Sequence, residues 1–142
     1  MTQKQVLFLC TGNSCRSQMA EALVNALLPG IWHAYSAGTQ PSGFVHPLAL
    51  AALAEIDITH SGKSKSVEVF RGQPFDMVVT LCDSAAETCP VWLEAGRRVH
   101  LSFPDPAKTE GSPTQKMEAF RAMLKDMQVQ IPELLLTVQQ ED

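Results

Sequence analysis

Hydrophobic residues follow two patterns along the chain: short continuous runs, and longer stretches in which they recur three and four positions apart. A continuous run predicts a strand buried on both faces of a parallel sheet, whereas the three-and-four spacing predicts a helix. These patterns predict strands over residues 4–10, 31–37, 75–81 and 97–102. They predict helices over residues 16–28, 47–56 and 114–139, and short elements, helical or irregular, over 66–72 and 84–89. Pro132 lies inside the last helix and should kink or divide it, because proline lacks the N–H group that a helix needs.

Strands that alternate with helices predict an α/β fold, in which a parallel four-stranded sheet has helices on both faces. The chain has 142 residues, enough for one domain over 1–142 with a full core, and it shows no internal repeat or linker. Ligands of such sheets bind at the carboxyl ends of the strands. The segments that follow residues 10, 81 and 102 all lie at this edge, so we expect the functional site there.

The segment Cys10-Thr11-Gly12-Asn13-Ser14-Cys15-Arg16-Ser17 has the features of an anion-binding loop, because it joins the first strand to the first helix. Backbone N–H groups in such a loop point inward, and the helix dipole favours negative charge at this end. Gly12 lets the backbone turn sharply and approach a ligand, and Arg16 offers a planar set of donors for a tetrahedral oxyanion. The same field favours the thiolate form of Cys10, a nucleophile, and Ser17 is placed to donate its hydroxyl to that sulfur. The alternative, a buried cysteine and a solvated arginine, is less favoured because phosphate-binding motifs require this strand–loop–helix setting.

Composition and charge narrow the classes of function. The formal net charge is −4 and no basic run is present, which argues against a nucleic-acid partner. The apolar run near the N-terminus is too short for a signal peptide, and no apolar run approaches the length of a membrane span. We therefore expect a cytoplasmic protein with no membrane partner, in a compartment where thiols stay reduced.

The chain contains four cysteines, which in a reducing compartment are more typical of catalysis or metal binding than of structural disulfides. Zinc binding is disfavoured, because no two cysteines are separated by two residues and the histidines show no paired spacing. We expect each of the four histidines to be an ordinary surface or core residue: His33, His46, His60 and His100. We expect no metal ion and no bound cofactor.

Cys82 and Cys89 form a second pair of interest at the end of the third strand. Ser84, with Glu87 three residues later, favours a helix that begins there. Seven helical residues rise by about 10 Å, whereas a disulfide needs Cα atoms within about 7 Å. The two cysteines can therefore pair only if the segment unwinds, which would make oxidation a conformational switch. Together with Cys10, these thiols suit a relay of thiol–disulfide exchange, although two small apolar residues packed at the sheet edge remain an alternative.

Asp105 is the candidate general acid. It stands between Pro104 and Pro106 just after the fourth strand, and the two prolines stiffen a loop that must present a carboxyl group to a leaving oxygen. The alternative is an ordinary Asp-Pro turn. Cys15 lies within the anion loop, and we expect it to pack there without a catalytic role.

These motifs together resemble the low-molecular-weight tyrosine phosphatase superfamily, and within it the thioredoxin-coupled arsenate reductases. Residues 10–21 are similar to the anion loop and first helix of these proteins, and residues 35–38 to the end of their second strand. Residues 78–82 with Cys89-Pro90 resemble the redox segment of the reductases, and Asp105-Pro106 resembles the acid loop. The resemblance covers the chain from end to end, and the set of three cysteines is its specific part.

The resemblance implies reduction of arsenate to arsenite, and hence arsenic detoxification. The oxyanion would be held by Arg16 and by the backbone amides of the loop: Thr11, Gly12, Asn13, Ser14, Cys15 and Arg16. The thiolate of Cys10 would attack arsenic while Asp105 protonates the leaving hydroxyl. Cys82 would then form a disulfide with Cys10. Cys89 would attack Cys82 in turn and form a Cys82–Cys89 disulfide. Thioredoxin, or a glutaredoxin-type donor, would reduce that disulfide, and we expect the chain to act as a monomer.

Some relatives of this type bind potassium, and their ligands would fall on Asn13, Glu21 and Ser36, with an acidic residue in the loop after the second helix. This chain carries Lys63 and Lys65 in that loop and no acidic residue between positions 57 and 68. We hypothesise that the ammonium group of Lys65 takes the place of the cation near Glu21, so that activity does not depend on potassium. The alternative is a solvated lysine.

Two other functions compete with the reductase. A tyrosine phosphatase would need only Cys10, Arg16 and Asp105, but members of that class resemble one another in placing aromatic residues after the Asp-Pro pair. Here residues 107–109 are Ala-Lys-Thr, which disfavours an aryl substrate but leaves weak phosphatase activity on small esters. A thiol redox sensor with an oxyanion pocket would be oxidised once and stop, whereas a reductase would turn over.

Overall fold

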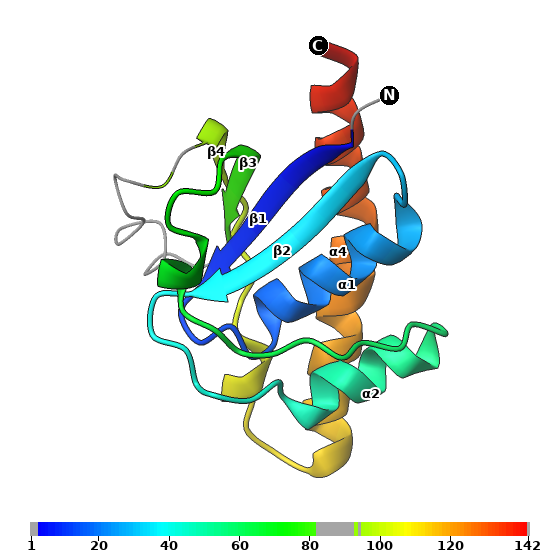
Figure 1. Ribbon diagram of the computed structural model, residues 1–142. Coiled ribbons are helices and arrows are strands. Elements are labelled where there is room, and N and C mark those ends of the chain that lie inside the picture. Colours follow the sequence, from blue (N-terminus) through cyan, green and yellow to red (C-terminus); the bar gives the residue numbers. More distant parts are fainter. Residues whose placement is uncertain (1–2, 82–92, 94, 142) are drawn as a thin grey trace.

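A parallel sheet of four strands forms the centre of the computed structural model, which describes residues 3–81, 93 and 95–141 (Figure 1). The strand order is β2-β1-β3-β4, and the strands are β1 (Lys4–Cys10), β2 (Trp32–Gly38), β3 (Phe75–Thr80) and β4 (Ala95–His100). The α-helices are α1 (Arg16–Leu27), α2 (Pro47–Glu55) and α4 (Pro113–Glu141), and the short 3₁₀ helices are η1 (Val67–Phe70) and η2 (Pro106–Lys108). The predicted α/β fold with a parallel four-stranded sheet is confirmed.

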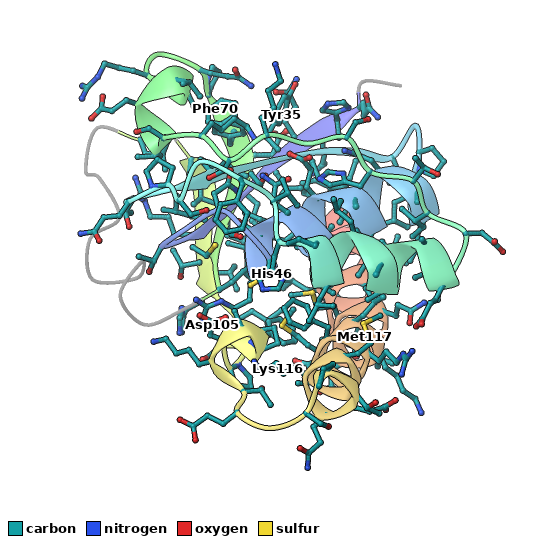
Figure 2. All side chains as sticks on the ribbon, turned by 90° about the horizontal axis from the view of Figure 1, so that it is seen from below. Tyr35, His46, Phe70, Asp105, Lys116 and Met117 are labelled. Carbon is teal, nitrogen blue, oxygen red and sulfur yellow. The ribbon has the colours of Figure 1, made fainter. Side chains whose placement is uncertain are left out.

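The two faces of the sheet are covered differently. Helices α1 and α4 pack on one face, and η1 lies on the other (Figures 1 and 2). Figure 2 shows Tyr35 and Phe70 on the η1 side, where their rings lie 5.6 Å apart, and Met117 of α4 on the opposite side. Several large side chains of the core are completely buried between the sheet and the helices: Phe8, Met19, Leu23, Phe120 and Met127.

Helix α4 runs through Pro132 without a break, so it is not divided there, and the alternative prediction of a kink stays a prediction. Proline removes only one hydrogen bond, to the carbonyl group of Gln128, which lies in an exposed stretch where water can solvate it. Met127, Ile131 and Leu135 are completely buried around the proline, and their packing holds the helix together across it. Although α4 has 29 residues, neither it nor any other helix of the described chain is long and apolar enough to cross a membrane.

The fourth strand begins two residues earlier than predicted, at Ala95, and ends at His100. Its pairing is set by β3, because Ala95 lies opposite Phe75 and His100 lies opposite Thr80, where β3 ends. Backbone bonds to the β3 segment continue past the strand, since Phe103 N–H still donates to Leu81 O at 3.0 Å. The predicted short element over 84–89 lies outside the described residues.

Gly38, at the end of β2, packs directly against the loop that follows β1. A methyl group at Gly38 would stand 2.5 Å from Thr11 O and 3.0 Å from Asn13 N, so an alanine there must displace backbone. We expect Gly38→Ala to destabilise the fold by about 1–3 kcal/mol in urea unfolding and to weaken phosphate binding. Gly12→Ala is the matched control for stability, because its added methyl has no neighbour closer than 3.9 Å. Equal unfolding midpoints for the two variants would contradict this close packing.

Candidate active site

The loop between β1 and α1 is held from outside by the segment 39–46. Three loop carbonyls accept backbone hydrogen bonds of 2.9 Å from this segment: Thr11 O from Gln40, Gly12 O from Ser42 and Ser14 O from His46. In a trans peptide unit the carbonyl oxygen and the following N–H point in opposite directions. The N–H groups of Gly12, Asn13 and Cys15 therefore point away from the segment 39–46 and into the concave side of the loop, where an anion can accept them.

Asn13, not Gly12, supplies the left-handed turn of the loop, with φ of 49°. The expectation that Gly12 makes the sharp turn is therefore corrected; asparagine tolerates this conformation better than most residues with a side chain. The Asn13 side chain is completely buried, and its Oδ1 accepts from the backbone N–H of Lys65 at 2.9 Å and from Gln18 Nε2 at 3.0 Å. These bonds tie the loop to the chain around residue 65.

Cys10 lies at the base of the loop, and the residue is 2 % exposed. Its Sγ is 2.9 Å from the hydroxyl oxygen of Ser17, in the first turn of α1. That oxygen also accepts a hydrogen bond from Asn13 Nδ2 at 2.8 Å, which leaves the hydroxyl proton free to be donated to the sulfur when Cys10 is a thiolate. The structure thus brings Cys10, Asn13 and Ser17 together in the arrangement expected for a supported thiolate.

Arg16 and Asp105 meet above the loop. Arg16 Nη1 donates to Phe103 O at 3.3 Å, and Nη2 lies 3.7 Å from Asp105 Oδ2. Arg16 Nε is buried and has no hydrogen-bond partner among the described residues. A buried donor without a partner is costly, so this atom favours an anion that would accept from it. Both predicted residues therefore lie at the same site, contributed by α1 and by the segment after β4.

Cys15 is buried in the loop, 5 % exposed, and its sulfur faces Asp105. Its Sγ donates to Asp105 Oδ1 across 3.5 Å. Burial raises the pKa of the Cys15 thiol to about 12, and the nearby charge of Asp105 acts in the same direction. Cys15 therefore stays protonated and is not a second nucleophile at neutral pH.

Cys82 and Cys89 lie outside the described residues, so the proximity of the three thiols stays a prediction. Leu81 is the described residue that precedes Cys82 in the sequence. Its backbone N–H donates to Leu9 O at 2.9 Å, which places Leu81 beside the end of β1, next to Cys10.

Glu21 and Ser36 do lie together behind the loop, as the expected remnant of a cation site requires. Ser36 Oγ donates to Glu21 Oε1 at 3.0 Å. The amine of Lys65, however, donates to Lys63 O at 2.9 Å. Burial lowers the pKa of Lys65, and the charge of Glu21 opposes this effect, so the two charges do interact. The substitution of Lys65 for a cation therefore stays a hypothesis.

The described part of the chain holds no cluster of three or more acidic, histidine or cysteine side chains suited to a metal ion.

Two histidines adjoin the site although their spacing gave no sign of it. His60 Nε2 lies 2.7 Å from Gln18 Oε1 and 3.7 Å from Glu21 Oε2. His46 precedes α2, accepts the N–H of Leu48 at Nδ1 and packs its ring 4.7 Å from that of Phe120. Figure 2 shows His46 and Asp105 on the same side of the sheet. Only the folded chain brings these histidines near the loop, so sequence spacing could not reveal them.

These histidines predict a loss of stability in mild acid. Burial lowers the pKa of both His46 and His60 in the folded state, with Asp105 and Glu21 respectively opposing the effect. The unfolded chain therefore binds more protons below about pH 6.5, and the free energy of unfolding falls as pH decreases through that value. We expect urea unfolding to show this fall between pH 7 and 5, and His46→Gln/His60→Gln to reduce its slope. An unchanged slope in that variant would assign the dependence to other groups.

Comparison with known families identifies the class of protein to which this site belongs. Residues 5–142 match the family described as low molecular weight phosphotyrosine protein phosphatase. The chain belongs to this family.

Known relatives place the chain more narrowly. The arsenate reductase of Halalkalibacterium halodurans is 46% identical over 122 residues, which make up 85% of this chain and 87% of that protein. A solved structure described as an arsenate reductase in the phosphate binding state shares 31% identity, with a TM-score of 0.81 over 95% of this chain and 98% of that chain. Another, described as an arsenate reductase in oxidized state, shares 29% identity, with a TM-score of 0.79 over 96% and 99% of the two chains. The resemblance to arsenate reductases drawn from the sequence is confirmed.

Proposed function

We propose that this protein reduces arsenate to arsenite with electrons from its own thiols. The observation that carries the proposal is the Cys10 sulfur, held by Ser17 at the base of a loop whose N–H groups converge on one space. The buried Nε of Arg16 offers a further donor to a tetrahedral anion in that space. The identity of 46% to a curated arsenate reductase supports arsenate as the anion.

The proposed chemistry begins when the Cys10 thiolate attacks arsenic and forms an S–As(V) bond. The departing hydroxyl takes a proton from Asp105 and leaves as water. The Cys82 thiol, losing its proton, then attacks the Cys10 sulfur. The S–As bond breaks, and its electron pair stays on arsenic, which leaves as arsenite. Two thiols have been oxidised to the Cys10–Cys82 disulfide, and arsenic has been reduced by two electrons.

Cys89 completes the cycle in this proposal. Its thiolate attacks Cys82, releases the Cys10 thiolate and leaves a Cys82–Cys89 disulfide. A dithiol protein, thioredoxin or a glutaredoxin-type donor, then reduces this disulfide, so the chain needs no bound cofactor. What supports this part of the proposal is the sequence alone: Cys82 and Cys89 follow β3 and are seven positions apart.

Weak hydrolysis of phosphate esters is a second proposed activity. Phosphate and arsenate share shape and charge, and a relative of 31% identity is described in a phosphate binding state. Cys10, Arg16 and Asp105 are the groups that such hydrolysis requires. The Ala-Lys-Thr sequence at 107–109 offers no aromatic side chain to bind an aryl group, so we expect activity on small esters only.

A coupled assay tests the relay. Reduced protein is mixed with arsenate, thioredoxin, thioredoxin reductase and NADPH, and NADPH oxidation is followed. We expect steady oxidation with the wild-type protein. Cys82→Ser and Cys89→Ser should stop within one turnover, yet keep part of the phosphate-ester hydrolysis, because they leave the anion loop intact.

The outcomes of the assay separate the competing functions. Full cycling by Cys89→Ser would refute the relay. Oxidation of one equivalent of NADPH by the wild-type protein, followed by arrest, would identify a redox sensor. If the protein is active only when a glutaredoxin system replaces thioredoxin, the proposed electron donor is wrong but the proposed arsenate reduction stands.

A further inference from the structure

We propose that the Cys15 thiol is a positioning residue for the general acid, fixing Asp105 so that its Oδ2 atom carries the transferred proton. This inference deepens the proposed function and rests on it. Cys15 lies in the anion loop and Asp105 ninety residues later, so the contact joins the two parts of the site.

The two oxygens of Asp105 have different surroundings. Oδ1 accepts the backbone N–H of Ala107 at 3.0 Å and the thiol of Cys15 at 3.5 Å. Oδ2 lies 3.7 Å from Arg16 Nη2, beyond hydrogen-bond distance. A carboxylic acid carries one proton, and an oxygen that already accepts two donors is a poor place for it. The proton of Asp105 is therefore carried on Oδ2, on the side of the guanidinium group that would hold the oxyanion.

Cys15 is suited to this task because its thiol remains a neutral donor. It is buried, and burial together with the charge of Asp105 raises its pKa to about 12. Cys15 also stands at the N-terminal end of α1 without making a side-chain capping bond to the helix. Its S–H is therefore available to the acid loop, where a thiolate would instead repel the carboxylate.

In the proposed step, Asp105 gives one proton to the departing hydroxyl. The O–H bond at Asp105 Oδ2 breaks as the departing hydroxyl takes the proton and becomes water. The electron pair of that bond stays on the carboxylate, whose Oδ1 is then stabilised by the Ala107 N–H and the Cys15 S–H. Losing the thiol would leave the carboxyl free to rotate and would weaken this stabilisation.

A double-mutant cycle tests the inference through single-turnover arsenate reduction by the reduced protein. We expect Cys15→Ala to lower the saturating rate about tenfold, as for one lost hydrogen bond to a charged group, with half-saturation by arsenate changed less than about twofold. Cys15→Ser keeps a donor and should recover most of the rate. In an Asp105→Asn background, Cys15→Ala should cost less than about twofold, because the residue acts through Asp105.

Several results of the cycle would overturn the inference. An equal loss in both backgrounds would show that Cys15 supports the loop rather than the acid. A changed half-saturation with an unchanged rate would assign the residue to anion binding. Failure of Cys15→Ser to exceed Cys15→Ala would show that packing, not hydrogen bonding, is what Cys15 provides.

A measurement that needs no arsenate separates this inference from the proposed function. The carboxyl carbon of Asp105 is followed by ¹³C NMR during a pH titration of the resting protein. Loss of the thiol donor should move the titration to higher pH in Cys15→Ala, and Cys15→Ser should restore it. A wild-type protein inactive on arsenate would refute the proposed function, whereas identical titrations in all three proteins would refute the role of Cys15.

Discussion

Cys10→Ser should abolish arsenate reduction completely and lower phosphate-ester hydrolysis by about 10⁴-fold or more, as expected for loss of a covalent nucleophile. A serine hydroxyl is a weak nucleophile at neutral pH, and an oxygen could not enter the disulfide whose formation is proposed to release arsenite. Ser17 would still face the substituted residue. The measurements are single-turnover arsenite formation and release of phosphate from a small ester.

Binding controls show whether Cys10→Ser leaves the loop intact. Titration calorimetry with inorganic phosphate should give an affinity within a few-fold of wild type, because the N–H groups and Arg16 remain in place. Thermal unfolding should change little, since serine is only slightly smaller than cysteine. Measurable arsenite formation by this variant would assign the first attack to another thiol.

Arg16→Lys should lower kcat/KM for arsenate by about 100-fold or more, because lysine cannot reproduce a planar set of donors. The guanidinium group donates to Phe103 O, lies beside Asp105 and has a buried Nε without a hydrogen-bond partner among the described residues. A lysine amine offers one point of charge and loses this fixed geometry. The loss should appear in phosphate affinity as well as in the rate of arsenate reduction.

Arg121→Lys is the matched control for this substitution. Arg121 is an exposed arginine of α4 that donates to Glu55 of α2 at 2.7 Å and also contacts Glu118. Exposed ion pairs contribute little to stability, so kcat/KM should stay within about twofold of wild type. Similar losses in both variants would mean that Arg16 acts through general stability and not through the anion.

The position of the anion loop could be predicted because local sequence dictates it. An apolar strand, a polar loop and the N-terminus of a helix follow one another over residues 4–27, and the structure shows this order. The pairing of Cys10 with Ser17 also follows from local geometry, since the two residues flank the loop. Asp105 was found because its flanking prolines mark a stiff segment after the last strand.

Other features depend on contacts between distant segments. The left-handed residue of the loop is Asn13, because the chain around Lys65 binds its side chain. Helix α4 continues through Pro132 because Met127, Ile131 and Leu135 are buried around it, and their burial cannot be predicted from the local sequence pattern. The contacts of Cys15 with Asp105 and of His60 with Gln18 join residues 90 and 42 positions apart, so spacing carries no sign of them.

The backbone bonds that the segment 39–46 makes to the loop have a consequence for the energetics of recognition. These bonds hold the loop backbone in one shape, so binding of the proposed anion would cost little conformational entropy. That shape is imposed by a neighbouring stretch of chain and does not belong to the loop sequence itself. A synthetic peptide with the sequence of residues 8–20 should therefore be disordered and bind oxyanions only weakly. Grafting this loop onto another scaffold should also require the segment 39–46 that holds it from outside.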